Sequence, residues 1–438
     1  MSRPESTGVP DSPGTTGARQ PVVAAPSAAA FGSDQERPHS AFRYRGFRIW
    51  VIGSFSAMAG VRLNQVALTV LVFDLTGSAL DLGLLAAATA GPTIVVSVFG
   101  GVLADLIDTR KLLAVSTVIV TSVLSLIAVL VVTDSIEIWH IFALAAVNGV
   151  AMGLDEPARE TYFTSLVPRA ALRSAITNNG VLRASNSVLM PTLGGVVIAT
   201  AGLSLAFFLA AGAWGVMLMT LFFLPSRHSI ARSRNPVADL VAGIAYIGKR
   251  RMFVAVITLQ FAATFLGSGW IQILPAYVDL FGGGPREVGY MFSAAGLGAL
   301  TGIIISGRVN TSPRLGWIAV GASLLFATSL LIVAIAPALA LALPAAYAAH
   351  LGSGLLFMST RTAIQLRVDE EVRGRVMGIV AITNSLFVLG GLFTGSMAAI
   401  LGIRAGMLVG PLIVIAVGLL LLATQSELRN LDGRPEKT

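Results

Sequence analysis

The sequence of 438 residues contains no cysteine. Disulfide bonds, thiolate metal ligands and cysteine nucleophiles are therefore excluded as a basis for its fold or chemistry. Charged residues are also scarce, at 12% of the chain, whereas a soluble domain carries about 25%. Hydrophobic residues make up 55% of the chain, and the mean hydropathy is +0.81. This balance indicates that lipid surrounds most of the folded chain.

Catalytic and metal-binding clusters are missing as well. The four histidines are scattered, and no nucleophile, base or metal-ligand set converges, so we expect no enzyme activity, no metal site and no cofactor. A net charge of +8 is often a sign of nucleic-acid binding. Here the basic residues stand in short loops between apolar runs, as topology signals do, so we expect no nucleic-acid partner.

What the sequence has in abundance is long apolar runs. About twelve of them are long enough to cross a bilayer, because a helical span needs roughly 20 apolar residues. Each span must be helical, since lipid offers no hydrogen bonds to an open backbone. The sequence therefore predicts an all-α membrane protein. The predicted spans are Phe47–Phe73, Ala79–Ala104, Leu112–Thr133, Ile138–Pro157, Ser174–Ala201, Ser204–Leu224, Phe253–Val278, Val288–Ser306, Gly316–Ala336, Leu339–Thr360, Gly374–Ile400 and Gly406–Ala423.

The basic residues predict how the chain is threaded. Of the 30 lysine and arginine residues, only Arg286 and Arg404 fall in loops that would face outward, and only Arg62 and Arg183 fall well inside spans, away from their cytoplasmic ends. The positive-inside rule therefore places both termini in the cytoplasm. The predicted organisation is a disordered cytoplasmic tail over 1–40, a six-helix bundle over 41–224, a basic cytoplasmic linker over 225–251, a second six-helix bundle over 252–424 and a cytoplasmic tail over 425–438.

The two halves are related in sequence. Asp74–Gly77 closes the first span, and Asp279–Gly282 closes the seventh with the same pattern of residues. Asp81–Gly83 likewise matches Glu287–Gly289 at the start of the next span in each half. Such weak internal symmetry is typical of transporters in which two repeats enclose a site near the membrane midplane.

The turn between the second and third spans, Gly101–Lys111, carries a marked pattern of small and charged residues. Gly101 allows two helices to close tightly, and Asp105 is suited to a helix N-terminus in the other half. Arg110 and Lys111 are suited to anionic lipid at the interface. The alternative is that these basic residues only hold the loop inside.

The fifth span contains Pro191, Gly194 and Gly195. The proline removes a backbone donor and bends the helix, and the two glycines permit close contact with another helix. The three residues therefore predict a hinge in this span. The alternative is that these residues are ordinary glycine and proline of a membrane helix, where both are frequent.

Together these patterns resemble the major facilitator superfamily. Gly101–Lys111 resembles its motif A, although Leu106 and Asp108 depart from the usual arginine and glycine, and Asn186–Gly195 resembles its antiporter motif C without the two leading glycines. The resemblance implies two six-helix pseudo-repeats around a cavity and proton-driven export. The segments that resemble one subgroup, the third drug:proton antiporter family of macrolide-efflux and enterobactin-exporter type, are Leu75–Leu80, Gly100–Asp105, Leu166–Arg169 and Gly374–Gly378.

The two arginines within spans are open to two interpretations, because a charge in hydrocarbon is costly and is expected to be paired or functional. In one, Arg183 pairs with Glu156 or Asp155, and Arg62 bonds to carbonyls of a neighbouring helix. In the other, both arginines face a central path and bind an anionic substrate. No carboxylate lies near the middle of any predicted span, so a cationic substrate is disfavoured.

The remaining candidates follow from position and chemistry. His350 is the midspan group that titrates near physiological pH, which predicts proton coupling; the alternative is a neutral histidine that bonds between helices. Trp270 is suited to stacking on an aromatic substrate or to anchoring at the interface. The resemblance implies that the first, fourth, seventh and tenth spans line the cavity. The predicted substrate-binding residues are Arg62, Asn64, Gln65, Asn148, Arg183, Trp270, Gln272, His350 and Asn384.

The sequence thus predicts a secondary active transporter that exports a small amphipathic compound, neutral or anionic, such as a drug or a siderophore, by alternating access. The expected partners are this small-molecule substrate, the proton and the membrane lipids, and the protein is expected to act as a monomer. A lipid flippase or an importer on the same fold is the alternative, and the sidedness of transport separates the two.

Overall fold

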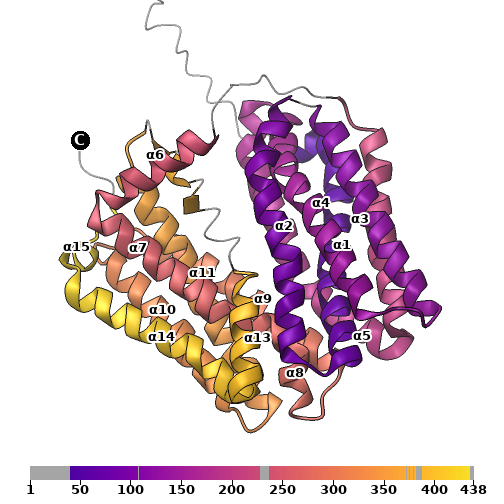
Figure 1. Ribbon diagram of the computed structural model, residues 1–438. Helices are drawn as coiled ribbons and strands as arrows, with labels where there is room; N and C mark the ends of the chain where they lie inside the picture. Colours follow the sequence, from indigo (N-terminus) through magenta and orange to yellow (C-terminus); the bar gives the residue numbers. More distant parts are fainter. Residues whose placement is uncertain are drawn as a thin grey trace, which may run out of the picture. The chain divides into compact units, whose positions relative to one another are not determined.

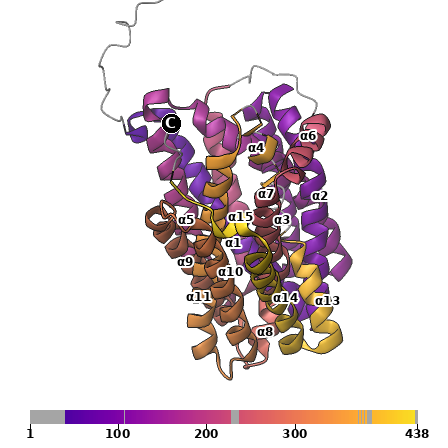
Figure 2. The same ribbon diagram turned by 90° about the vertical axis from the view of Figure 1, so that its left-hand side faces the viewer.

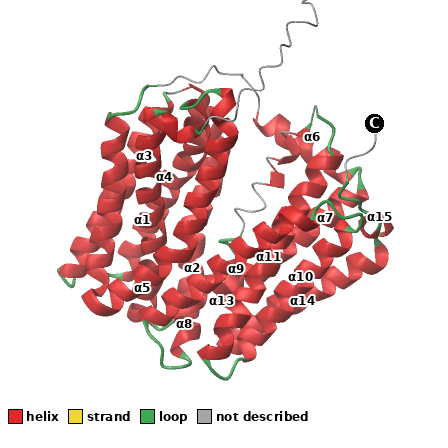
Figure 3. Ribbon diagram, turned by 180° about the vertical axis from the view of Figure 1, so that it is seen from behind, coloured by secondary structure: helices red, strands yellow, loops and turns green. Residues whose placement is uncertain are grey.

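The computed structural model describes residues 40–434 with gaps at 107, 227–235, 371, 374, 378 and 381–386, and without side chains at 98–106 and 236–240. Every regular element over these residues is a helix, and no strand is drawn in Figure 3. Ten of the described helices are long and apolar enough to cross a membrane. The predicted all-α membrane class is therefore confirmed.

The N-terminal half consists of helices that pack on one another (Figure 1). The last of them is 54 residues long, about 80 Å of helix, which is far more than a bilayer core of about 30 Å requires. It is divided at Gly202, whose φ of +85° breaks the helix where the sequence predicts a turn between the fifth and sixth spans. The elements are η2 (Ala41–Arg43), α1 (Arg45–Thr76), α2 (Ala79–Leu106), α3 (Thr109–Val132), α4 (Ile138–Ser165) and α5 (Arg169–Phe222).

The C-terminal half repeats this arrangement after the linker helix α6 (Pro236–Gly248). Its seventh span is built from four consecutive pieces, α7 (Arg251–Phe261), η3 (Ala262–Gly267), η4 (Ser268–Ile273) and α8 (Leu274–Asp279). Figure 2 shows the long helices that follow, of which α9 packs on α11, α11 on α10, α10 on α14 and α14 on α13. They are α9 (Pro285–Val309), α10 (Leu315–Ile335), α11 (Leu339–Arg367), α13 (Gly390–Leu401) and α14 (Ile403–Thr424), and the short α15 (Ser426–Arg429) follows.

The seventh span is irregular at its centre. Its η3 piece is a π-helix and its η4 piece is a 3-10 helix, whereas the hydropathy pattern predicts one regular helix. Close backbone contact explains the difference. A Cβ placed on Gly269 would lie 2.1 Å from the carbonyl oxygen of Gly390, and one on Gly390 would lie 2.1 Å from that of Phe265. Irregular turns of this kind are frequent at functional sites.

Four glycines with positive φ mark corresponding turns in the two halves. Gly77 (φ +61°) ends α1 and Gly282 (φ +65°) follows α8, which is the pairing that the sequence repeat predicts. Gly202 and Gly402 both have φ +85° and divide the last two spans of each half. Because consecutive spans run in opposite directions, all four turns lie at one end of the helices, which we name the glycine-turn end.

Two seams of close backbone contact join the halves toward the glycine-turn end. In the α5–α9 seam, a Cβ on Gly195 would lie 2.4 Å from the carbonyl oxygen of Pro285, and one on Gly289 would lie 2.5 Å from that of Pro191. In the α2–α13 seam, a Cβ on Gly83 would lie 2.8 Å from the carbonyl oxygen of Gly391. Residues without a side chain are therefore what allow these helices to meet.

Candidate functional site

Arg62 lies in the middle of α1 and is half-buried. Its Nη1 donates to Oε1 of Gln65, one turn further along the same helix, at 3.0 Å. Among the residues that the structure describes, no carboxylate forms an ion pair with it, and the charge nearby is a second cation, Arg183. The expectation that Arg62 bonds to carbonyls of a neighbouring helix is therefore wrong. An unneutralised guanidinium within a span is costly unless a ligand or water compensates it.

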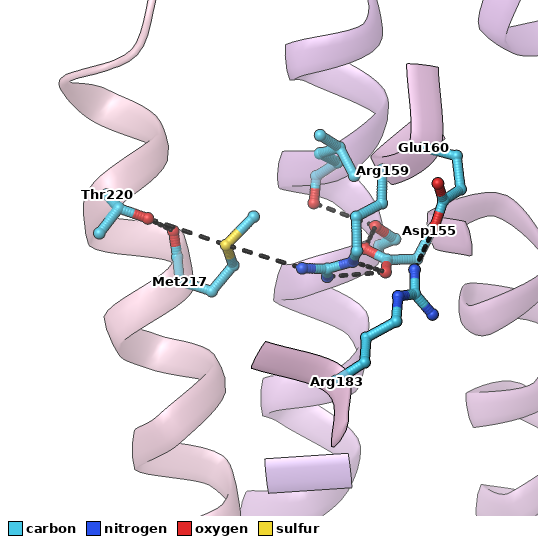
Figure 4. Close-up of polar contacts among 8 residues, drawn as sticks. Asp155, Arg159, Glu160, Arg183, Met217 and Thr220 are labelled. Carbon is cyan, nitrogen blue, oxygen red and sulfur yellow. Dashed lines mark hydrogen bonds and ion pairs between the residues drawn. The ribbon is translucent and has the colours of Figure 1, made fainter. Parts of the chain in front are cut away.

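Arg183 of α5 pairs with Glu160 of α4 (Figure 4). The partners expected from the sequence, Asp155 and Glu156, are both wrong. The cause is the length of α4, which continues through Pro157 as far as Ser165 and so carries Glu160 beyond the predicted end of the span. Both side chains of the pair remain substantially exposed, at 41% for Arg183 and 49% for Glu160. Such a pair is weak and leaves the guanidinium accessible to a ligand.

Asp155 has a different partner, which is buried. Arg159 reaches it with Nε at 2.8 Å and Nη2 at 2.7 Å, and Ser116 of α3 donates to its other oxygen at 3.1 Å. The guanidinium of Arg159 lies 5.7 Å from the ring of Trp50 and 5.5 Å from that of Trp214. This cluster ties α1, α3, α4 and the second part of α5 together inside one half. Its burial and internal pairing make it structural.

His350 of α11 lies beside one other candidate of the C-terminal half, Trp270. Its ring lies between those of Trp270, at 5.8 Å, and Phe326, at 6.2 Å, and its Nδ1 is 3.2 Å from the carbonyl oxygen of Ala346. A carbonyl only accepts, so Nδ1 carries the proton and Nε2 offers a lone pair. Trp270 is 2% exposed, and its Nε1 has no hydrogen-bond partner among the described residues.

The other predicted residues are spread over the two halves. Asn64 and Asn148 each hold a buried side-chain oxygen without a described hydrogen-bond partner, which marks them as places for water or a ligand. Gln272 is buried beside the α2–α13 seam, where it lies against Gly391. Asn384 falls outside the described residues. The structure thus brings Arg62, Gln65 and Arg183 together in one half, and His350 and Trp270 in the other.

The α2–α3 turn is fastened to its own half. Asp108 caps α3 by accepting from the backbone N–H of Arg110 at 2.9 Å, and Ser226 donates to its other oxygen. Arg110 also donates to the carbonyl oxygen of Phe222 at 3.3 Å, while the neighbouring Lys111 is exposed. Gly101 and Asp105 belong to the last turns of α2, but their side chains lie outside the described part of the structure.

The two glycines of the Asn186–Gly195 segment contact two different helices. Gly195 faces α9 across the seam, whereas a Cβ on Gly194 would lie 2.9 Å from Cδ1 of Leu63 in α1. Pro191 stands inside α5 without ending it, and its carbonyl oxygen meets Gly289. The motif is therefore the place where α5 contacts both its own half and the other one.

The profile of the transmembrane secretion effector family matches residues 36–436, which is nearly the whole chain. The chain belongs to this family. Relatives include the uncharacterised MFS-type transporter YfiS of Bacillus subtilis, 26% identical over 374 residues that cover 81% of this chain and 87% of that protein. The enterobactin exporter EntS of Escherichia coli K12 is 25% identical over 393 residues, which cover 89% and 94%. These relatives are membrane transporters of the major facilitator type, as the motifs indicate.

Solved transporter structures have the same fold as this chain. A bacterial homologue of the lysosomal transporter Spinster superposes with a TM-score of 0.69 at 14% identity, over 87% of this chain and 97% of that one. The nucleoside transporter NupG superposes with a TM-score of 0.68 at 13% identity, over 86% of this chain and 98% of that one. The predicted major facilitator fold is therefore confirmed.

Three charged residues of the chain were not among the predicted site residues. Arg159 and Glu160 lie just beyond the predicted end of the fourth span, and Arg361 lies just beyond that of the tenth, so the hydropathy pattern assigns all three to loops. The structure places them within α4 and α11. A signal was present in the i, i+4 spacing of Asp155 and Arg159, which brings two opposite charges together on a helix.

Proposed function

We propose that this protein exports a small amphipathic compound, neutral or anionic, by alternating access driven by the proton gradient, with both termini in the cytoplasm. The substrate class is that of drugs and siderophores. The observation that carries the proposal is the cationic group of the N-terminal half, in which Arg62 has no described carboxylate partner and Arg183 shares only an exposed one. A site with a surplus of guanidinium charge favours an anion over a cation.

Export is supported by one relative, and the orientation of the chain follows from its basic residues. One relative is named an enterobactin exporter. We extend the direction of its transport, out of the cell, to this protein. The basic residues gather away from the glycine-turn end, with Arg286 and Arg404 as the exceptions, and the positive-inside rule makes that basic end cytoplasmic. The two close seams then lie at the outer side.

Proton coupling is proposed for His350. It is the titratable side chain at the centre of α11, and its Nε2 is left available by the bond that Nδ1 makes. A proton that binds there would add a charge to a span, which must be offset by movement of the surrounding helices.

The test is transport into everted membrane vesicles that contain the protein, with a panel of fluorescent compounds that share one aromatic body and differ in charge. We expect uptake of the anionic and neutral members on energisation, and no uptake of the cationic ones. The double variant Arg62→Ala, Arg183→Ala should lose uptake of the anionic members. The matched control is Arg308→Ala, Arg314→Ala, which also removes two positive charges, both exposed, at the end of α9 and before α10. Normal uptake of anions by the first double variant rejects the proposal, and uptake by right-side-out vesicles alone identifies an importer.

A further inference from the structure

The linker helix α6 has a packed face and an open face. The packed face lies on the segment between α11 and α13, where a Cβ on Gly243 would be 2.7 Å from Cδ1 of Ile379 and 3.3 Å from the carbonyl oxygen of Arg375. Ile247, one turn later, is buried on the same face. Because residues four apart share one face of a helix, Gly243 and Ile247 fix how α6 is turned about its axis.

The open face of α6 is apolar. Val241 is 61% exposed and Ile244 is 56% exposed, and the exposed Ala245 and Gly248 continue this face at helical spacing. The sequence from Val241 to Gly248 contains no charged residue. Clustered apolar side chains that stay this exposed mark a surface that another apolar phase covers. The helix has 13 residues, about 20 Å, which is too short to cross a bilayer and is suited to lying along its surface.

The end of α6 lies where the seventh span enters the bilayer. The ring of Tyr246 contacts that of Phe253 in α7, with the ring centroids 5.7 Å apart, and α7 begins at Arg251, three residues after α6 ends. Arg251 is also the first residue of a segment, Arg251–Asp279, that is long and apolar enough to cross a membrane. The last turn of α6 is therefore level with the first turn of a span, at the depth of the lipid head groups.

Three basic residues follow α6 directly. The middle one, Arg250, is engaged within the protein, because its Nη2 lies 3.0 Å from Oδ2 of Asp369 and its guanidinium lies 4.8 Å from the ring of Tyr246. Lys249 and Arg251, on either side of it, are exposed and form no ion pair or side-chain hydrogen bond with any residue that the structure describes. Each lysine or arginine close to an anionic membrane surface strengthens binding to it about fivefold. The apolar face and the two available cations together match a bilayer surface that carries negative charge.

We propose that α6 docks on the anionic phospholipids of the membrane surface at the basic end of the molecule. Val241 and Ile244 enter the boundary between head groups and acyl chains, and Lys249 and Arg251 pair with lipid phosphates. Arg250, which is held by the residue that closes the turn after α11, joins the docked helix to the C-terminal half. This docking is independent of the substrate and of the direction of transport.

The test uses the full chain, reconstituted in vesicles of phosphatidylcholine with or without phosphatidylglycerol, which is anionic. Because the sequence has no cysteine, Ile244→Cys offers a single thiol for the environment-sensitive fluorophore NBD. In vesicles that contain phosphatidylglycerol, we expect blue-shifted emission and strong quenching by a lipid that carries a nitroxide on its acyl chain. In neutral vesicles, or at high salt, the ratio of docked to undocked α6 should fall at least about fivefold, because the attraction to lipid phosphates is absent or screened.

Removal of the two available cations tests their part in docking. Addition of Lys249→Gln, Arg251→Gln to the labelled protein should lower the docked-to-undocked ratio about 25-fold in anionic vesicles, fivefold for each charge. The matched control is Arg308→Gln, Arg314→Gln, which removes two exposed charges at the turn between α9 and α10 and should leave the ratio unchanged. Thermal unfolding and elution as a single species establish that each variant is folded.

A second labelled position controls for the probe itself. Thr311→Cys lies at an exposed polar position in the α9–α10 turn, also at the basic end, and its NBD emission should report water in both kinds of vesicle. Quenching at Ile244→Cys that is no stronger than at Thr311→Cys overturns the proposal. So does quenching at Ile244→Cys that is the same in neutral and anionic vesicles, or that the two charge-removing double variants lower equally.

Discussion

Thr192 of α5 and Ser293 of α9 are hydrogen bonded across the two halves of the molecule. Their hydroxyl oxygens are 2.7 Å apart, and the backbone N–H of Thr192 donates to the same serine oxygen at 3.1 Å. The pair lies next to Pro191, within the α5–α9 seam. Because the two residues come from different halves, any movement that opens this seam must break both bonds. The seam is therefore where a change between alternate states can be measured.

A cross-link at this pair should stop transport. The sequence has no cysteine, so the double variant Thr192→Cys, Ser293→Cys offers one disulfide and no competing thiols. Oxidation should hold the seam closed and abolish uptake into vesicles, because alternating access requires the seam to open. A reductant should restore it.

The control is a cross-link within one half. Asn310, directly after α9, donates to Thr362 of α11 at 3.1 Å, so Asn310→Cys, Thr362→Cys places a disulfide inside the C-terminal half. Uptake by this variant should survive oxidation. Full transport by the cross-linked Thr192–Ser293 variant would show that the seam does not open during the cycle.

Overfilling the same seam should have the opposite structural effect. A leucine at Gly195 has no room, because a Cβ there already meets the carbonyl oxygen of Pro285 at 2.4 Å. Overpacking costs about 1–3 kcal/mol, which lowers the population of the closed seam by roughly 5- to 150-fold. Gly195→Leu should therefore reduce transport and raise the rate at which an impermeant thiol reagent labels Ser293→Cys from outside.

Gly212→Leu is the comparison for this substitution. It lies in the second part of the same helix, and nothing stands within 4 Å of a Cβ placed there. Transport and labelling should match those of the parent protein. Equal behaviour of the two leucine variants would mean that the contact at Gly195 does not hold the halves together.

Much of the fold could be predicted from the sequence, because a span is recognised from a run of apolar residues alone. The turn at Gly202 falls between two predicted spans, and Gly77 matches Gly282 as the repeat indicates. The four-piece seventh span could not be predicted. Its irregular turns arise where the backbone of Gly269 meets that of Gly390, a contact between residues far apart in the sequence.

The candidate site was predicted less well, for a related reason. The residue types at Arg62 and Arg183 mark them as candidates, but their partners depend on where helices end. Polar residues can continue a helix beyond the apolar run, and α4 does so through Glu160. The apolar run stops at Pro157, so hydropathy alone assigns the true partner of Arg183 to a loop.

The buried pair of Asp155 and Arg159 should be important for stability. They are 1% and 6% exposed. Removal of one partner from a buried pair costs about 3–5 kcal/mol, because the other charge is left uncompensated. We therefore expect Arg159→Met to lower the free energy of unfolding by about this amount, as measured by thermal unfolding in detergent.

The double variant Asp155→Leu, Arg159→Met tests the cause of that loss. With both charges gone, it should be more stable than Arg159→Met alone, since no unpaired charge remains in the core. If the double variant is less stable than Arg159→Met, this account is contradicted. The dominant effect would then be the packing of Arg159 against Trp50 and Trp214.

Neutralising Glu160 should separate stability from binding. Its ion pair with Arg183 is exposed, and such pairs contribute about 0–1 kcal/mol, so Glu160→Gln should unfold almost as the parent protein does. The loss of a negative charge beside Arg183 should raise the uptake of the anionic compounds of the vesicle panel severalfold and leave that of the neutral compounds unchanged. Lower uptake of the anionic compounds would mean that Glu160 positions Arg183 for the ligand.

Replacing His350 should uncouple transport from the proton gradient. The ring is enclosed by Trp270 and Phe326, so His350→Gln keeps a polar side chain of similar size that cannot take up a proton. We expect the variant to lose uptake against a gradient while it still exchanges labelled for unlabelled substrate. His140→Gln is the control, because His140 lies at the start of α4, far from the centre of α11 in sequence and partly exposed, where its Nδ1 accepts from the backbone N–H of Glu137 at 3.1 Å. Energised uptake by His350→Gln at the parental rate would exclude this histidine from coupling, because glutamine cannot take up a proton.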